Sequence, residues 1–369
     1  MSPARRLSPL ACLAMLVFAP GCAAPPWRMG APLDGRPSIP PTQARRTAAE
    51  SRAAAVAART AGRPPLEIVA LTELNVSDHL SELERTRLAD LLVSRAAAFH
   101  DMGRAIPESG DLEAAVGLGA RGEGLGRERA AALAAAGDAW KAIGAQAEAR
   151  AAYARATALG GAPPGTSAPV ATPVRVPASP PADLDAWLFV GPALSTRLVP
   201  LAAAFPAVLD DVPRALGWAE ILLSEDPTSP DVLELVALIF GRARRLGGTE
   251  RMLMELTYHT PDRAAGLARG AAVWERLGRV REACAQWIRA ARWRDQADDP
   301  AWRKSVACAR RDPGAGNWQS IRDYAVNLAP AERRAALAAE LEAAGAPPPA
   351  TPAAPAPPDA GASAPTGAN

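Results

Sequence analysis

The feature that most constrains the fold is a seven-position pattern of small, aliphatic and aromatic residues that occurs twice, within residues 133–161 and 267–294. Both copies have successive intervals of four, three, four, five, four and three residues. The positions are Leu133, Gly137, Trp140, Gly144, Ala149, Tyr153 and Ala156, and then Leu267, Ala271, Trp274, Gly278, Ala283, Trp287 and Ala290. Intervals of three and four are typical of one helix face, and a glycine ends a helix at little cost. Each copy therefore predicts two helices joined by a tight turn.

The residue types at these positions favour close packing of the two helices. Small residues at Gly137 and Ala149 let the backbones approach each other, and Trp140 and Tyr153 fill the space around them. The pattern resembles the tetratricopeptide repeat, a helix–turn–helix unit of about 34 residues. The resemblance implies an all-α fold in which the units stack into a solenoid, because one unit cannot bury its apolar face alone.

In proteins built from this repeat, the concave face of the solenoid is the usual surface for binding another protein. For this chain the resemblance implies four charged candidates on that face, Asp138, Lys141, Arg269 and Glu275. A solvated surface charge is the alternative explanation for each of them. Weaker copies of the pattern at 213–227 and 231–248, with further helices after residue 295, extend the predicted C-terminal solenoid.

Composition favours the same fold class and argues against one kind of partner. Aromatic residues are only 5% of the chain, and alanine-rich stretches with Leu, Arg and Glu favour helix over strand. The chain has 41 Lys and Arg against 39 Asp and Glu. A near-neutral balance argues against nucleic-acid binding, which needs a clustered basic surface.

The N-terminus predicts export and attachment to a membrane. Two arginines precede a mostly apolar run at residues 7–18, which is too short to cross a bilayer and is typical of a secretory signal peptide. The next residues, Ala19-Pro20-Gly21-Cys22, resemble the bacterial lipobox. The resemblance implies that residues 1–21 are removed and that Cys22 carries a lipid. A plain signal peptide cut near Ala24 is the alternative, and it would leave a soluble periplasmic protein.

Proline-rich stretches divide the rest of the chain. We expect a signal peptide at 1–21, a partly disordered tether at 22–64, an N-terminal helical body at 65–160 with one repeat at about 130–161, a proline-rich linker at 161–182, a C-terminal solenoid at 183–345 and a disordered Ala/Pro-rich tail at 346–369. The first long helix of the N-terminal body is expected to have Ser77 or Asp78 as its N-cap, with Leu80 and Leu83 in its apolar stripe.

The sequence contains no recognisable catalytic or metal-binding motif. None of the three histidines stands at ligand spacing from another histidine or a cysteine. We therefore expect no metal, no cofactor and no small-molecule substrate. The alternative is an enzyme that acts on peptidoglycan or lipid through Glu82, Glu84 or Asp90 in the N-terminal body.

Two cysteines follow Cys22 in the expected mature chain, Cys284 and Cys308. The midpoint between them lies in a polar stretch that predicts a turn between antiparallel helices. They would then stand at similar heights on adjacent helices and form a disulfide in an oxidising compartment. Two buried thiols are the alternative.

The combination of lipid, tether and solenoid resembles the tetratricopeptide lipoproteins of bacterial envelopes, which include pilotins and a component of outer-membrane β-barrel assembly. This resemblance implies a non-catalytic, lipid-anchored scaffold that binds an envelope protein during assembly of an envelope or secretion complex. Ala23 and Ala24, where Asp is absent, favour the outer membrane with the body facing the periplasm. A structural spacer without a specific ligand is a further alternative.

Overall fold

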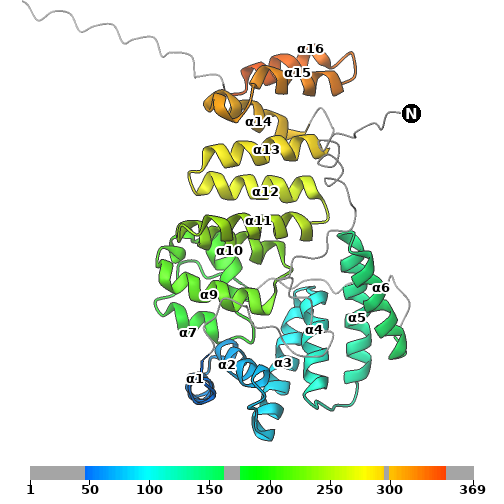
Figure 1. Ribbon diagram of the computed structural model, residues 1–369, viewed down its shortest axis with the longest axis vertical. Helices are drawn as coiled ribbons and strands as arrows, with labels where there is room; N and C mark the ends of the chain where they lie inside the picture. Colours follow the sequence, from blue (N-terminus) through cyan, green and yellow to red (C-terminus); the bar gives the residue numbers. More distant parts are fainter. Residues whose placement is uncertain (1–45, 162–174, 295–298, 346–369) are drawn as a thin grey trace, which may run out of the picture. The chain divides into compact units, whose positions relative to one another are not determined.

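The computed structural model describes residues 46–161, 175–294 and 299–345 (Figure 1). All regular secondary structure in these ranges is helical, which confirms the all-α class. The signal peptide, Cys22, most of the tether and the C-terminal tail lie outside the described residues.

The described residues form two compact units, with the boundary after Met252 inside α11 (Leu246–His259). Two bodies were expected on either side of the stretch 161–182. Instead, the helices before and after this stretch belong to the same first unit. Residues 162–174 lie outside the described part of the chain, and 175–183 contain no helix.

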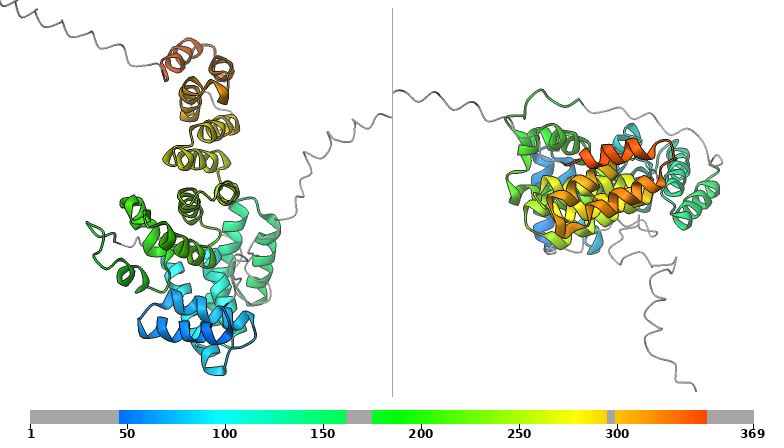
Figure 2. Two further views of the ribbon diagram at one scale, coloured as in Figure 1. Left: turned by 60° about the vertical axis from the view of Figure 1, so that its left-hand side comes forward. Right: turned by 90° about the horizontal axis from the view of Figure 1, so that it is seen from above.

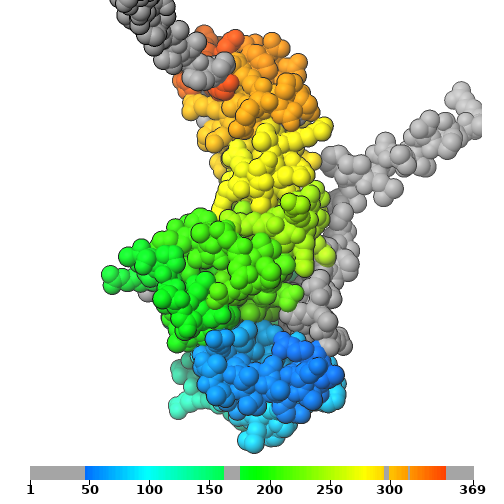
Figure 3. Space-filling model, turned by 90° about the vertical axis from the view of Figure 1, so that its left-hand side faces the viewer, coloured from blue at the N-terminus to red at the C-terminus, as the bar shows by residue number. Residues whose placement is uncertain are grey.

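The first unit contains helices that pack mainly against their neighbours in the chain. Its elements are α1 (Ala48–Thr60), α2 (Pro64–Val76), α3 (Glu82–Asp101), α4 (Ala105–Gly117), α5 (Leu125–Ala142), α6 (Gln146–Ala158), α7 (Leu184–Phe189), α8 (Ser195–Ala204), η2 (Pro206–Leu209), α9 (Val212–Glu225) and α10 (Pro230–Arg242). In addition, α2 packs against α7 and α9. Figure 3 shows the blue N-terminal helices directly beside the green helices that follow the proline-rich stretch.

The helical body begins earlier than expected, because α1 belongs to it. This helix starts with a capping box between Thr47 and Glu50, and Ala55 and Ala58 are buried on the face toward α2. The Ser51 hydroxyl, also buried, donates to Glu73 of α2 at 2.6 Å. Alanine side chains are sufficient to pack α1 against α2, because small side chains allow two helices to approach closely. The expected boundary at residue 65 is therefore wrong for residues 47–64.

The N-terminus of α3 also differs from the expectation. Its N-cap is Ser81, whose hydroxyl accepts from the backbone N–H of Glu84 while the Glu84 carboxylate accepts from the backbone N–H of Ser81. Ser77 instead ends α2, and Asp78 has a positive φ in the turn between the helices. The reciprocal capping box satisfies two donors, which a cap at residue 77 or 78 would leave open. Leu83 follows the new cap and is 85% exposed, outside the apolar stripe.

Ion pairs join α3 to α4 and connect this part of the chain to the helices after the proline-rich stretch. Arg95 of α3 donates from Nε and Nη2 to the two carboxylate oxygens of Asp111 on α4, both at 2.7 Å, and Arg95 is 3% exposed. Arg104, between α3 and α4, donates to the Asp231 carboxylate at 3.0 Å and to the hydroxyl of Ser229, the N-cap of α10. Because charges withdrawn from water are costly unless paired, the buried pair Arg95–Asp111 fixes α3 against α4. The half-buried Arg104 joins this part of the chain to α10.

Glu225, the last residue of α9, lies in the same buried region. Its carboxylate accepts from the backbone N–H groups of Leu194 and Ser195 at 2.9 Å each, and so caps the N-terminus of α8. Burial raises the pKa of Glu225 to about 7, against the opposing charge of Arg95 and these two hydrogen bonds. At pH values between its unfolded pKa and about 7, Glu225 therefore binds a proton when the chain folds.

The second unit is a succession of antiparallel helices, α12 (Arg263–Arg276), α13 (Val280–Arg294), α14 (Pro300–Arg311), η3 (Pro313–Ala315), α15 (Trp318–Leu328) and α16 (Arg334–Ala343). Each of α12 to α15 packs against the next, as Figures 1 and 2 show. Trp302, Val306 and Ile321 are buried at the centre of its core. Cys284 of α13 and Cys308 of α14 form a disulfide, with an S–S distance of 1.96 Å and Cα atoms 5.3 Å apart.

The first prediction concerns Glu225. A carboxyl whose folded pKa is raised to about 7 binds a proton that the unfolded chain has already lost above its own pKa of about 4.5. The free energy of unfolding should therefore fall as the pH rises from 4.5 to 7, by up to about 3 kcal/mol from this group. Glu225→Gln should remove this slope in urea titrations at pH 5, 6, 7 and 8. The exposed Glu123→Gln is the matched control, and an unchanged slope in Glu225→Gln would contradict the prediction.

The second prediction concerns the disulfide. A cross-link that closes a loop of 24 residues lowers the entropy of the unfolded chain and is worth about 3 kcal/mol. Cys284→Ala with Cys308→Ala should lower the free energy of unfolding of the second unit by about that amount, and reduction of the parent should have the same effect. Reduction should leave the double variant unchanged. Peptide mapping without reductant that recovers both cysteines as free thiols would refute the pairing.

Candidate functional site

The two copies of the seven-position pattern lie on α5–α6 in the first unit and on α12–α13 in the second. Gly144 and Gly278 have φ angles of 79° and 70° in the turns between the paired helices. The positions that are buried in the two pairs are Leu133, Gly137, Ala149 and Ala156, and Leu267, Ala271, Trp274, Ala283 and Ala290. Both copies thus place their small and aliphatic positions between helices.

Gly137 shows why a small residue is needed at this position of the first copy. A Cβ atom there would clash with the ring of Tyr153 on α6, so α5 and α6 approach too closely for a side chain. At the same position of the second copy stands Ala271, which is fully buried. The aromatic partner is Tyr153 in one pair and Trp287 in the other.

The polar atom of each aromatic partner binds the first helix of its pair. The Tyr153 hydroxyl donates to Asp138 at 2.6 Å, and this hydrogen bond raises the pKa of Tyr153 to about 12. The Trp287 indole N–H donates to Glu275 at 3.0 Å. Asp138 and Glu275, expected as partner-binding candidates, are therefore engaged in holding the helix pairs together.

The other two candidates do not complete a charged surface with them. Arg269 is half-buried on α12, and Lys141 is exposed near the end of α5. Lys141 and Asp138 belong to the first unit, whereas Arg269 and Glu275 belong to the second. The four residues therefore do not define a single binding site within either unit.

The three carboxylates of the enzymatic alternative do not converge on one site. Glu82 and Asp90 are exposed on α3. Glu84 accepts from the Arg52 guanidinium at 2.6 Å, and this hydrogen bond is the main cause that lowers its pKa to about 2. A carboxyl with so low a pKa remains ionised and does not serve as a general acid near neutral pH.

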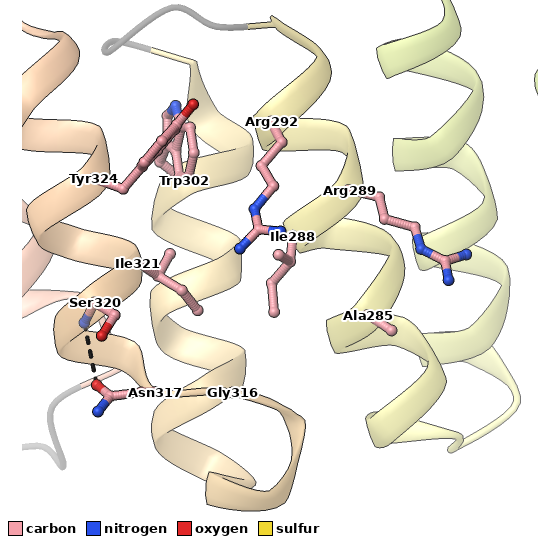
Figure 4. Close-up of a pocket in the computed structure, with 10 residues that line it drawn as sticks. All are labelled: Ala285, Ile288, Arg289, Arg292, Trp302, Gly316, Asn317, Ser320, Ile321 and Tyr324. Carbon is pink, nitrogen blue, oxygen red and sulfur yellow. Dashed lines mark hydrogen bonds between the residues drawn. The ribbon is translucent and has the colours of Figure 1, made fainter. Parts of the chain in front are cut away.

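The second unit contains a groove that the sequence did not indicate, with a volume of about 550 Å³ (Figure 4). It lies along α13, α14 and the N-terminal half of α15. Its lining residues are Ala285, Ile288, Arg289 and Arg292 from α13, Trp302 from α14, and Gly316, Asn317, Ser320, Ile321 and Tyr324 around the start of α15. None of these ten residues is acidic.

The groove has an apolar floor, and the residues around it carry polar groups. Ile288 and Ile321 are apolar and lie beside Trp302, which is almost fully buried. Tyr324 is 48% exposed, and its ring centroid lies 5.5 Å from that of Trp302. Asn317 caps α15 by accepting from the backbone N–H of Ser320 at 3.1 Å, the bond drawn in Figure 4. The groove thus combines aliphatic and aromatic surface with hydroxyl groups.

Two arginines of α13 supply positive charge at this groove. Arg289 and Arg292 are both exposed, and neither forms an ion pair with a carboxylate among the described residues. In Figure 4, Arg292 extends toward Ile288 and the groove, whereas Arg289 points away toward the neighbouring helix. Arg294 on the same helix differs, because it pairs with Asp262 and lies 3.5 Å from Asp299. Among the described residues, the positive charge that α13 supplies to the groove is therefore not paired with a carboxylate.

Sequence reasoning missed this groove because its residues come from three helices. The only local signal is the composition of α13, which contains four arginines and one glutamate. Such a charge run is usually a solvated helix face. The apolar floor becomes visible only when α13 and α15 both pack against α14.

In comparisons with known proteins, no protein-family model matches the chain, and no curated protein is significantly similar to it. Within the described ranges, no helix has both the length and the apolar character needed to cross a membrane. In the same ranges, no group of three or more His, Cys, Asp or Glu side chains is arranged to hold a metal ion.

The third prediction concerns the close approach of α5 and α6. Gly137→Ala places a methyl group against the ring of Tyr153 and should lower the free energy of unfolding by about 1–3 kcal/mol. Adding Tyr153→Leu should recover part of the loss, because the clashing ring is then absent. Gly217→Ala on α9 is the control, since its methyl group meets open space and should stabilise by up to about 1 kcal/mol. Equal effects of the two alanines in urea titrations would refute the close approach.

Proposed function

We propose that this protein is a non-catalytic scaffold of the bacterial cell envelope that binds a protein partner through its helical surface. The observation that carries the proposal is the groove of the second unit, where exposed arginines and a tyrosine surround an aliphatic floor. Tyrosine and arginine are enriched at the centres of protein interfaces, where they contribute much of the binding energy. The groove brings together no nucleophile, base and acid in the arrangement that catalysis needs.

We also propose that the helix pairs α5–α6 and α12–α13 are tetratricopeptide repeats. The support is that both pairs share a glycine turn with positive φ, small residues between the helices, and an aromatic side chain on the second helix. In both pairs this aromatic side chain donates a hydrogen bond to a carboxylate on the first helix. Repeats of this kind form extended surfaces suited to binding proteins.

The membrane anchor in this proposal is a lipid on Cys22. Its support is the short apolar run followed by Ala19-Pro20-Gly21-Cys22. Because each buried CH₂ group contributes about 0.8 kcal/mol, several acyl chains would hold the body firmly at a membrane. The near-neutral mature chain would then bind neither nucleic acid nor a charged membrane surface through its net charge.

The fourth prediction tests anchor and scaffold together in a related bacterium. Intact mass should show loss of residues 1–21 and a gain of acyl chains on Cys22, and Cys22→Ala should leave the detergent phase because it has no lipid. A photo-crosslinking residue in place of Tyr324 should give one saturable crosslink to an envelope protein. The same residue in place of Leu83, which is exposed in the first unit, is the control.

Three outcomes would contradict parts of this proposal. An unlipidated product cut near Ala24 would indicate a soluble periplasmic adaptor. A lipidated protein that forms no specific crosslink at any exposed position of the two units would indicate a structural spacer. Crosslinks of equal yield from positions 324 and 83 would show that the groove is not the binding surface.

A further inference from the structure

We infer that the groove on α13–α15 binds an extended peptide segment in which acidic residues flank a large apolar side chain. This inference rests on the proposed function and specifies the chemistry of the partner. It is drawn from three properties of the groove, its charge, its floor and its length.

The charge of the groove selects an acidic ligand. Arg292 extends toward the groove, and Arg289 beside it is exposed and has rotatable bonds that allow it to turn toward a bound group. No lining residue is acidic, so a carboxylate entering the groove meets no like charge from its walls. Arginine pairs with carboxylates through two parallel hydrogen bonds, which fixes the orientation of the bound group as well as its affinity.

The floor selects an apolar side chain between the acidic residues. Ile288 and Ile321 are half-buried and buried, respectively, and the ring of Tyr324 is 48% exposed above Trp302. An aliphatic or aromatic side chain placed on this surface removes it from water. A purely acidic ligand would leave it exposed, so charge alone does not account for the groove.

The length of the groove matches a short extended segment. Its α15 wall runs from Asn317 to Tyr324 and its α13 wall from Ala285 to Arg292, which are eight residues each; the seven steps between first and last residue span about 10 Å of helix. An extended peptide advances about 3.3 Å per residue, so about three residues lie along the walls. An acidic–apolar–acidic triplet therefore places its apolar side chain over the floor while a neighbouring carboxylate reaches Arg292.

The experiment uses the full mature chain with Cys22→Ala, which avoids detergent, and measures fluorescence anisotropy with labelled octapeptides. One peptide has Asp-Leu-Asp-Phe-Asp at its centre, and its matched partner has Asn at the three acidic positions. A third peptide has five consecutive Asp residues. We expect the first peptide to bind at least about 10-fold more tightly than either of the others, because only it uses both the arginines and the floor.

Variants of the protein locate the binding in the groove. Arg292→Gln should weaken binding of the first peptide at least about 10-fold, Arg289→Gln should weaken it less, and Tyr324→Ala should weaken it without changing the preference for Asp over Asn. The double variant Arg281→Gln with Arg150→Gln removes the same charge as both groove substitutions from exposed arginines that do not line the groove. It should bind as the parent does. Far-ultraviolet circular dichroism checks that each variant is folded.

Several results would overturn the inference. Equal binding of the Asp and Asn peptides would be one such result. Equal effects of the double variant Arg289→Gln with Arg292→Gln and the control double variant Arg281→Gln with Arg150→Gln would be another. Tight binding of the all-Asp peptide would indicate attraction to net charge alone. Self-association of the protein that Arg292→Gln abolishes would show that a second copy occupies the groove.

The inference and the proposed function fail in different ways. If the peptides do not bind but the photo-crosslinker at position 324 captures an envelope protein, the scaffold function stands and the partner chemistry is wrong. If the acidic peptide binds as expected but no envelope protein is captured, the groove chemistry stands and the envelope function is wrong.

Discussion

Arg95 and Asp111 form a two-hydrogen-bond ion pair in the interior of the first unit, where both side chains are almost completely withdrawn from water. An ion in this position is tolerated only while its partner is in place. Glu225 adds a third buried ionisable group, and its carboxylate satisfies the N-terminus of α8. The Arg95 charge also acts on Glu225, and Arg104 pairs with Asp231 of α10, so charged contacts join helices from both sides of the proline-rich stretch within one compact unit.

The second unit is stabilised by different means, and this difference bears on function. Its helices are held by close-packed small and aromatic residues and by the disulfide between α13 and α14. Among the described residues, Arg289 and Arg292 of α13 form no ion pair with a carboxylate. A helix fixed by a disulfide and by apolar packing is suited to recognition, since little ordering entropy is lost when a ligand binds.

The pattern of small and aromatic residues predicted both helix pairs and the turns at Gly144 and Gly278, because these features depend on neighbours within one pair. It did not predict α1, whose face toward α2 is mostly alanine and looks too weak in isolation. It also misplaced the cap of α3, since Ser77, Asp78 and Ser81 are all acceptable N-cap residues and only the reciprocal bond with Glu84 distinguishes them. The partner candidates Asp138 and Glu275 were read as surface charges because their aromatic partners lie on the next helix.

The sequence by itself determined the all-α class, since helix periodicity, glycine turns and scarce β-branched runs are local properties that no distant contact needs to supply. The spacing along the chain also predicted that Cys284 and Cys308 lie on adjacent helices. It did not decide between a disulfide and two buried thiols. Only the tertiary structure decided which helices form one unit and where the arginines of α13 meet apolar surface. The reason is physical: the ion pair between Arg104 and Asp231 and the groove beside Arg292 join residues from helices that local periodicity cannot place side by side.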